Sequence, residues 1–309
     1  MNTQSNAIPD TPIAAHGFAP AIVPESRLLY WSVARELWES RSIYIAPLAV
    51  AALILVGFMV STFRLPGKIR AAVALDPMQQ HELFAQPYDF AALLIMATTF
   101  VVAVFYCLDA LHGERRDRSI LFWKSLPVSD LTTVLSKGAI PLVVLPLLTF
   151  AITVLTQSIM VLMSSAVLLA NGLSVATLWS QLSLPSTWGM LLYHLVAIHS
   201  LWYAPIFGWL LLVSAWARRM AILWAALPVL AIGLVEKIAF NTAHFATIIG
   251  RRFGGGTEAI TVPGGSPMDP MTHLTPAHFV SSPGLWLGLI VTAAFLAAAV
   301  RLRRSQGPI

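Results

Sequence analysis

Charged side chains are concentrated in one segment of this sequence. Residues 109–137 carry charges of both signs, whereas residues 138–217 contain no Asp, Glu, Lys or Arg. The charged segment also contains Phe122 and Trp123 close to its basic residues. Basic and aromatic side chains together are typical of a surface that binds another protein or lipid headgroups. This segment therefore predicts a binding surface, for another protein or for lipid headgroups, and not a catalytic site.

Motifs for nucleotide hydrolysis or catalysis are missing from the sequence. The Gly67-Lys68 pair lacks the upstream glycine of a Walker loop. His81-Glu82 starts like a zinc-protease motif, but Ala85 stands where the second histidine ligand is needed. No pair of carboxylates lies within an apolar run, where it could act as acid and base. We therefore expect no catalytic residues, no metal and no cofactor on this chain.

Two histidines, His194 and His199, lie far from the ends of a long apolar run, with Tyr203 nearby. Ionisable residues inside a membrane are usually functional, so these residues predict a candidate substrate or proton path. The alternative is a neutral histidine that is hydrogen-bonded to a neighbouring helix. A spacing of five puts the two rings on different faces of a helix, which favours this alternative.

The composition is that of a membrane protein. Of the 309 residues, 57% are hydrophobic and 11% are charged, and the mean hydropathy is +0.76. A chain this apolar needs the bilayer as its solvent. The net charge of +5 does not indicate nucleic acid, because the basic residues stand at the ends of apolar runs. A single cysteine, Cys107, excludes a disulfide within the chain. The expected fold class is all-α and polytopic.

Uncharged runs of roughly 20 residues predict six transmembrane helices. The predicted spans are about 43–62, 90–108, 139–170, 188–217, 220–237 and 281–300. The charged stretch 63–89 predicts an exposed loop, and the Ser- and Thr-containing stretch 171–187 predicts an external connection. The apolar piece 238–250 is too short to cross and predicts a re-entrant or interfacial segment. Residues 251–282, rich in Gly and Pro, predict a long external loop.

The ends of the chain predict its topology. Residues 25–41 have an apolar face with two tryptophans, which predicts an amphipathic helix at the membrane interface. Residues 25–304 are expected to form a single transmembrane domain. Residues 1–24 and 305–309 are expected to be cytoplasmic tails, and the N-terminal tail is expected to be disordered. Most of the 19 Lys and Arg residues then fall on the side that holds both termini. This bias predicts that both termini are cytoplasmic.

The charged segment itself predicts a short surface helix between spans two and three. Residues 114–124 have a helical composition, Pro127 interrupts the chain, and Ser129 can cap the next helix. The aromatic residues of this short helix either contact a partner protein or rest on lipid headgroups. The residue types alone give these two alternatives similar weight.

This segment resembles the first cytoplasmic loop of permease subunits in the ATP-binding-cassette (ABC) type-2 exporter family. The residues that carry the resemblance are Glu114-Arg115, Ser119-Ile120-Leu121, Leu126-Pro127-Val128-Ser129 and Lys137. The resemblance implies a coupling helix that docks into a groove of a separate ATPase subunit, which holds the ATP. It also implies six spans in the bacterial cytoplasmic (inner) membrane, and a second permease chain in a homodimer or heterodimer. The tail 1–24 and the loop 251–282 lie outside the resemblance.

The expected function is therefore the permease subunit of an ABC exporter, with a transporter role and no enzymatic activity of its own. The expected docking residues are Arg115, Arg118, Phe122, Trp123 and Lys124, with Glu114 and Asp117 orienting them. The alternative is a secondary transporter driven by an ion gradient, in which His194 and His199 carry protons.

Overall fold

A computed structural model describes residues 24–72, 76–125, 128–254 and 276–307 of the chain. The described residues form helices and connecting turns and contain no strand. The prediction of an all-α fold is therefore confirmed for this part of the chain.

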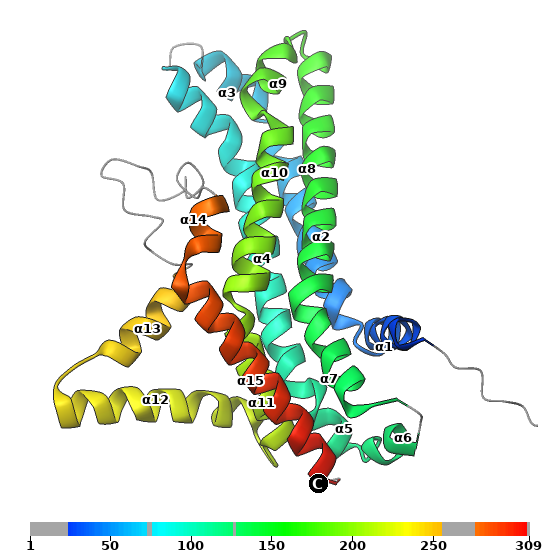
Figure 1. Cartoon of the computed structure of the whole chain (residues 1–309). Helices are drawn as coiled ribbons and strands as arrows, with labels where there is room; N and C mark the ends of the chain where they lie inside the picture. The colour runs from blue at the N-terminus through cyan, green and yellow to red at the C-terminus, as the bar shows by residue number, and fades with distance from the viewer. Residues whose placement is uncertain (1–23, 73–75, 126–127, 255–275, 308–309) are drawn as a thin grey trace, which may run out of the picture.

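Long apolar helices form a bundle (Figure 1). Five helical segments of the described chain are long and apolar enough to cross a membrane. They are Ser42–Thr62, Gln79–Arg116, Asp130–Ala170, Ala221–Phe240 and Pro283–Ser305. The pair Leu184–Trp202 and Ala204–Trp216 is bent by 46° and makes a sixth if it forms one broken span. The predicted multi-pass character is thus supported by helix length and composition.

Three of these helices pack against one another. They are α2 (Ser42–Thr62), α4 (Pro77–Ala110) and α8 (Leu145–Ala170). Ala51, Ile95 and Ile152 meet in a buried cluster where the three helices pack. Gln157 of α8 donates to the carbonyl of Tyr88 at 3.1 Å and accepts from the indole of Trp188 at 2.8 Å. Such hydrogen bonds between helices are a usual way of joining apolar helices in a bilayer.

The exposed loop predicted at 63–89 is wrong, because most of this stretch is helical. It contains α3 (Leu65–Ala72) and the first turns of α4, which begins at Pro77. Proline suits the first turn of a helix, where its missing N–H has no partner to lose. Phe84 and Tyr88 are buried one turn apart while Glu82 stays exposed. The charges therefore mark the outer face of an amphipathic helix and not a loop.

The third span begins earlier than predicted. Helix α7 (Asp130–Ala139) continues through a π-helical turn, η1 (Ile140–Val144), into α8. Ser129 caps α7 by accepting a hydrogen bond from the amide of Thr132 at 3.0 Å, as predicted. The π-helical turn contains Pro141, which cannot donate a backbone hydrogen bond, so the irregularity falls where α-helical bonding is already broken.

The stretch 171–187, predicted as a connection, contains α9 (Ala176–Leu182) and the start of α10 (Leu184–His194). Helix α10 continues as the π-helical η2 (Leu195–Trp202), and the bend at Tyr203 leads into α11 (Ala204–Trp216). On which side of a membrane this stretch lies stays a prediction.

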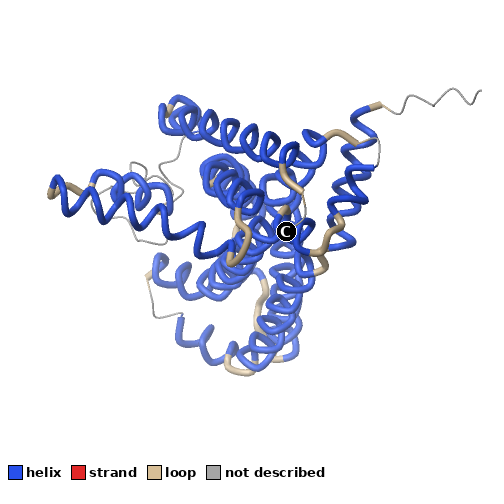
Figure 2. The backbone as a smooth tube through the Cα atoms, turned by 90° about the horizontal axis from the view of Figure 1, so that it is seen from below, coloured by secondary structure: helices blue, strands red, loops and turns tan. Residues whose placement is uncertain are grey.

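The last third of the chain consists of α12 (Ala221–Phe240), α13 (His244–Phe253), α14 (Pro276–Ser281) and α15 (Pro283–Ser305). Helices α12 and α13 project away from the bundle in both views (Figures 1 and 2). The predicted re-entrant segment covers the end of α12 and most of α13, and its place in a membrane stays a prediction. Much of the predicted loop 251–282 lies outside the described residues.

Helix α15 packs along α11, and a glycine permits the close approach. A Cβ atom added at Gly208 would lie 3.3 Å from Cγ2 of Thr292 and 3.5 Å from Cβ of Phe295. Small residues commonly occupy such contacts between helices in membranes.

The remaining short helices gather at one end of the bundle. They are α1 (Glu25–Glu39), α5 (His112–Arg116) and α6 (Ile120–Ser125), beside α7 and the end of α15 (Figure 1). Helix α1 directs Val33 and Leu37 towards the core, while Tyr30, Trp31 and Trp38 are exposed. Exposed aromatic residues on an amphipathic helix are consistent with the predicted interfacial position.

Candidate functional site

The end of the bundle that holds α1, α5, α6 and α7 contains a network of charged side chains, four of them buried and two partly exposed, which we call the ion network. It comprises Arg35 and Glu36 of α1, Glu114 of α5, Asp130 and Lys137 of α7, and Arg303 of α15. Three of these side chains are cationic and three are anionic, so the network is formally neutral. Neutrality matters here, because an unpaired charge out of water costs several kcal/mol.

Lys137 is the central cation of the ion network. Its ammonium nitrogen lies 2.9 Å from Oε1 of Glu36 and 3.1 Å from Oε1 of Glu114. The Lys137 side chain is only 3% exposed. Tyr106 of α4 adds a further donor, with its hydroxyl 3.0 Å from Oε2 of Glu36. The lysine therefore joins α1, α5 and α7 at a point that water does not reach.

Arg303 closes the ion network from the last turns of α15. Its Nε donates to Oδ1 of Asp130 at 3.0 Å, and its Nη1 donates to Oε2 of Glu114. The planar fork of a guanidinium can hold two carboxylates in fixed directions, which an ammonium group cannot do. Arg303 thereby ties α15 to both α5 and α7.

Arg35 connects the ion network to α6. Its Nη2 donates to Oε1 of Glu36 at 2.9 Å, and its guanidinium carbon lies 3.6 Å from the ring centroid of Trp123. This distance places the cation within the range of a cation–π contact. The indole of Trp123 is therefore held against α1 and does not face outwards freely.

The corner between α5 and α6 presents the exposed part of the segment. Arg118 has φ of 59°, which turns the chain sharply before α6 begins. Leu121 and Phe122 of α6 are 58% and 59% exposed. These two apolar side chains stand next to exposed basic residues, the combination expected of a protein contact.

Helix α5 is fixed to the end of α11 by hydrogen bonds. Arg115 Nη1 donates to the carbonyls of Ala215 and Ala217 at 2.6 and 3.3 Å, and these carbonyls belong to the C-terminal end of α11. A cation at this end of a helix is favourable, because the last carbonyls lack helical donors. The hydroxyl of Ser214 accepts from the amides of Leu111 and His112, both at 2.9 Å.

The structure divides the predicted docking residues into two groups. Those exposed are Asp117, Arg118, Phe122 and Lys124. Glu114 and Arg115 are buried with partners of their own, and Trp123 is half-buried beneath Arg35. Docking itself stays a prediction. Only the residues of the first group are exposed enough to contact a partner protein. The residues of the site that the sequence did not predict are Arg35, Glu36, Tyr106, Asp130, Lys137 and Arg303.

The predicted path residues lie in the middle of the bundle. The ring of His199 is 6.3 Å from that of Tyr203, 6.2 Å from that of Phe100 and 5.7 Å from that of Phe207. His199 is 5% exposed, and its Nε2 has no hydrogen-bond partner. The ring is therefore surrounded by aromatic residues, and the predicted hydrogen bond to a neighbouring helix is not made by Nε2. His194 is half-buried one turn earlier.

Helix α13 covers the bend at Tyr203. The Trp202 indole donates to the carbonyl of Arg252 at 3.0 Å, and the Tyr203 hydroxyl donates to that of Phe253 at 3.1 Å. The Arg252 guanidinium lies 4.2 Å from the Trp202 ring and donates to the carbonyl of Gly284 at 3.1 Å. Burial lowers the pKa of this guanidinium. These contacts hold the bent span against the start of α15.

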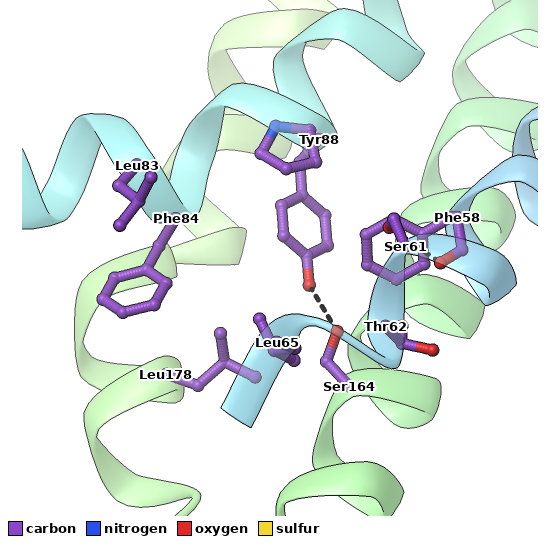
Figure 3. Close-up of a pocket in the computed structure, with 10 residues that line it drawn as sticks. Phe58, Ser61, Thr62, Leu65, Leu83, Phe84, Tyr88, Ser164 and Leu178 are labelled. Atoms are coloured by element: carbon purple, nitrogen blue, oxygen red, sulfur yellow. Dashed lines mark hydrogen bonds between the residues drawn. The ribbon is translucent and has the colours of Figure 1, made fainter. Parts of the chain in front are cut away.

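A pocket lies between the end of α2, the first turns of α4 and α8 (Figure 3). In Figure 1 the neighbouring helices α3 and α9 lie at the opposite end of the bundle from α5 and α6. It is narrow, with a cavity volume of about 30 Å³. Its walls are mostly apolar, and the Tyr88 hydroxyl lies 3.3 Å from Oγ of Ser164 (Figure 3). The residues around it are Phe58, Ser61, Thr62, Leu65, Leu83, Phe84, Pro87, Tyr88, Ser164 and Leu178.

Known proteins give no further guidance to this site. The chain has no match among protein-family models, curated proteins or solved structures.

Within the described residues, no three His, Cys, Asp or Glu side chains come together as a metal site would require.

Proposed function

We propose that this chain is the membrane-spanning subunit of an ABC exporter, and that it couples to a separate ATPase subunit through α6. The observation that carries the proposal is the exposed pair Leu121 and Phe122, presented on a short helix that rests on the ion network. An apolar pair beside basic residues is suited to a partner groove, in which aromatic anchors supply most of the binding energy.

The ion network supports this role mechanically. If an ATPase pushes on α6, the movement reaches the transmembrane helices only when rigid contacts join α6 to them. Helix α6 is linked through Trp123 to Arg35, whose Nη2 lies 2.9 Å from Oε1 of Glu36 and 3.7 Å from Oε1 of Glu114. Both carboxylates contact Lys137. Helix α5 follows α4, and α7 continues into α8, so a push on α6 would reach both long helices of the bundle core.

The arrangement of the termini is consistent with the same proposal. Helix α1 and the end of α15 lie at the same end of the bundle as α6 (Figure 1). If α6 faces an ATPase, this end lies in the cytoplasm, and both termini are cytoplasmic. The proposal includes the bacterial cytoplasmic membrane as location and a second permease chain, of the same or another sequence, as partner.

Affinity purification from membranes of the native host tests the proposal. We expect a protein with a Walker loop to co-purify in a stoichiometric amount, and the double substitution Leu121→Ala/Phe122→Ala to remove it. The matched control is Leu53→Ala/Val56→Ala, which changes two exposed apolar residues of α2. Equal recovery of the ATPase with both double variants would contradict docking at α6.

A second candidate function is a secondary transporter driven by an ion gradient. The observation in its favour is the buried His199, whose Nε2 has no partner and could accept a proton. Proteoliposomes that contain this chain alone discriminate the two functions. Proton flux that responds to a pH gradient and disappears in His199→Leu would favour the secondary transporter. We expect no such flux.

A further inference from the structure

The C-terminal segment Arg303–Gly307 lies against α5 and α6. Lys124 of α6 donates from Nζ to the carbonyl of Gln306 at 3.0 Å. Arg115 of α5 donates from Nε to the carbonyl of Gly307 at 3.4 Å. Two cations that the sequence predicts to contact an ATPase therefore hydrogen-bond to this chain's own C-terminal segment.

One buried residue holds this segment in place. Arg303 is 5% exposed and bridges Glu114 of α5 and Asp130 of α7. The arginines on either side of it, Arg301 and Arg304, are exposed. Of three arginines within four residues, only the middle one is built into the ion network, so its position is specific.

Helix α6 depends on such lateral contacts. It has six residues, and a helix of this length is unstable in isolation, because few hydrogen bonds repay the cost of nucleation. It begins directly after the turn at Arg118. Ile120, its first residue, is buried, and two further contacts orient the rest of the helix: the stack of Trp123 on Arg35 and the bond from Lys124 to Gln306.

We propose that Arg303 is a positioning residue for α6, and that residues 303–307 form part of the surface on which the ATPase subunit docks. The second half of this inference rests on the proposed function. The docking surface is then composite, with apolar contacts from α6 and backbone carbonyls from the C-terminal segment that fix Lys124 and Arg115.

Hydrogen exchange on the purified chain in nanodiscs tests the positioning role without any partner. The variants are Arg303→Ala and a deletion of residues 306–309, and the controls are Arg301→Ala and Arg304→Ala. We expect amides of residues 119–125 to exchange about tenfold faster in both variants, because a hydrogen bond to a charged group is lost. We expect no change in the controls, and none in α8 of the deletion variant. Arg303→Ala also leaves Glu114 without one of its cations, so exchange in α8 should become faster there too, but by less than in residues 119–125.

Two results would overturn the positioning role. One is unchanged exchange in residues 119–125. The other is an equal increase in α8, which would mean general destabilisation. Arg303→Lys provides a graded check, since an ammonium group keeps the charge but loses the forked geometry. Exchange in this variant should lie between wild type and Arg303→Ala.

Titration with the purified ATPase tests the docking half. The deletion of 306–309 should weaken binding about tenfold while the melting temperature of the chain stays unchanged. Unchanged binding would overturn the composite surface. Absence of binding to the wild-type chain would overturn the proposed function and the composite surface together, whereas faster exchange would still support the positioning role of Arg303.

Discussion

The carboxylate of Glu36 lies 2.9 Å from the ammonium group of Lys137, although the two residues are 101 positions apart in the sequence. Both side chains are 3% exposed. One belongs to the amphipathic helix before the first span and the other to the helix that continues into the third. This ion pair therefore attaches α1 to the bundle, and it does so at the base of the predicted docking surface.

Substitution of Lys137 by Met should destabilise the chain by about 3–5 kcal/mol, because Glu36 and Glu114 would stay buried without their shared cation. Thermal unfolding of the detergent-solubilised chain measures the loss. Lys237→Met is the matched control, since Lys237 is exposed. The double variant Glu36→Gln/Lys137→Met should lose less than the sum of its single variants. Additive losses would mean that the two residues are not coupled.

Substitution of Arg35 by Ala should loosen α6 from α1. The Arg35 side chain is 29% exposed, so its cation–π contact contributes about 1 kcal/mol, and tryptic cleavage after Arg118 and Lys124 should become several-fold faster without it. Arg27→Ala, at an exposed arginine of the same helix, should leave the cleavage rate unchanged. A similar rate in Arg35→Ala and Arg27→Ala would show that the stack on Trp123 does not restrain α6.

Substitution of His199 by Leu should change the stability of the chain by less than about 1.5 kcal/mol, because the ring is surrounded by aromatic residues and its Nε2 makes no hydrogen bond. Thermal unfolding gives the value. We also expect the variant to bind the ATPase as the wild type does. A loss of several kcal/mol would mean that the imidazole has a partner that stabilises the fold.

Substitution of Gly208 by Leu should separate α11 from α15 and cost about 1–3 kcal/mol through overpacking. Gly57→Leu is the control, because a Cβ atom at Gly57 meets nothing within 4 Å. That control should be neutral or slightly stabilising, since leucine is a better helix former than glycine. Equal stability of the two variants would contradict the close contact between α11 and Thr292.

Much of the fold was predictable from the sequence, because uncharged runs of sufficient length have few alternatives to helices in a bilayer. The uncharged stretch 43–62 corresponds closely to α2. Charge at 63–89 predicts a loop, but the structure has α3 and the start of α4 there. The spacing of Phe84, Tyr88, Ala91 and Ile95, all buried, was the helical signal available there.

The candidate site was predictable only in part. The Ser129 cap followed from local rules of capping. The single helix predicted at 114–124 is wrong, because the positive φ of Arg118 divides this stretch into α5 and α6. The burial of Glu36, Glu114 and Arg303 did not follow from local rules, because each is satisfied by partners far away in the sequence. A charged side chain on an amphipathic helix is expected to face water. That these three side chains are buried instead can be seen only from their tertiary contacts.

The most direct test of the account is a binding titration of the purified ATPase subunit against the chain in nanodiscs. Truncation of a central aromatic anchor commonly costs 2 kcal/mol or more, so Leu121→Ala/Phe122→Ala should weaken binding roughly 30-fold or more. Leu53→Ala/Val56→Ala should leave the dissociation constant unchanged. The same dissociation constant for wild type and for Leu121→Ala/Phe122→Ala would contradict the claim that α6 is the docking helix.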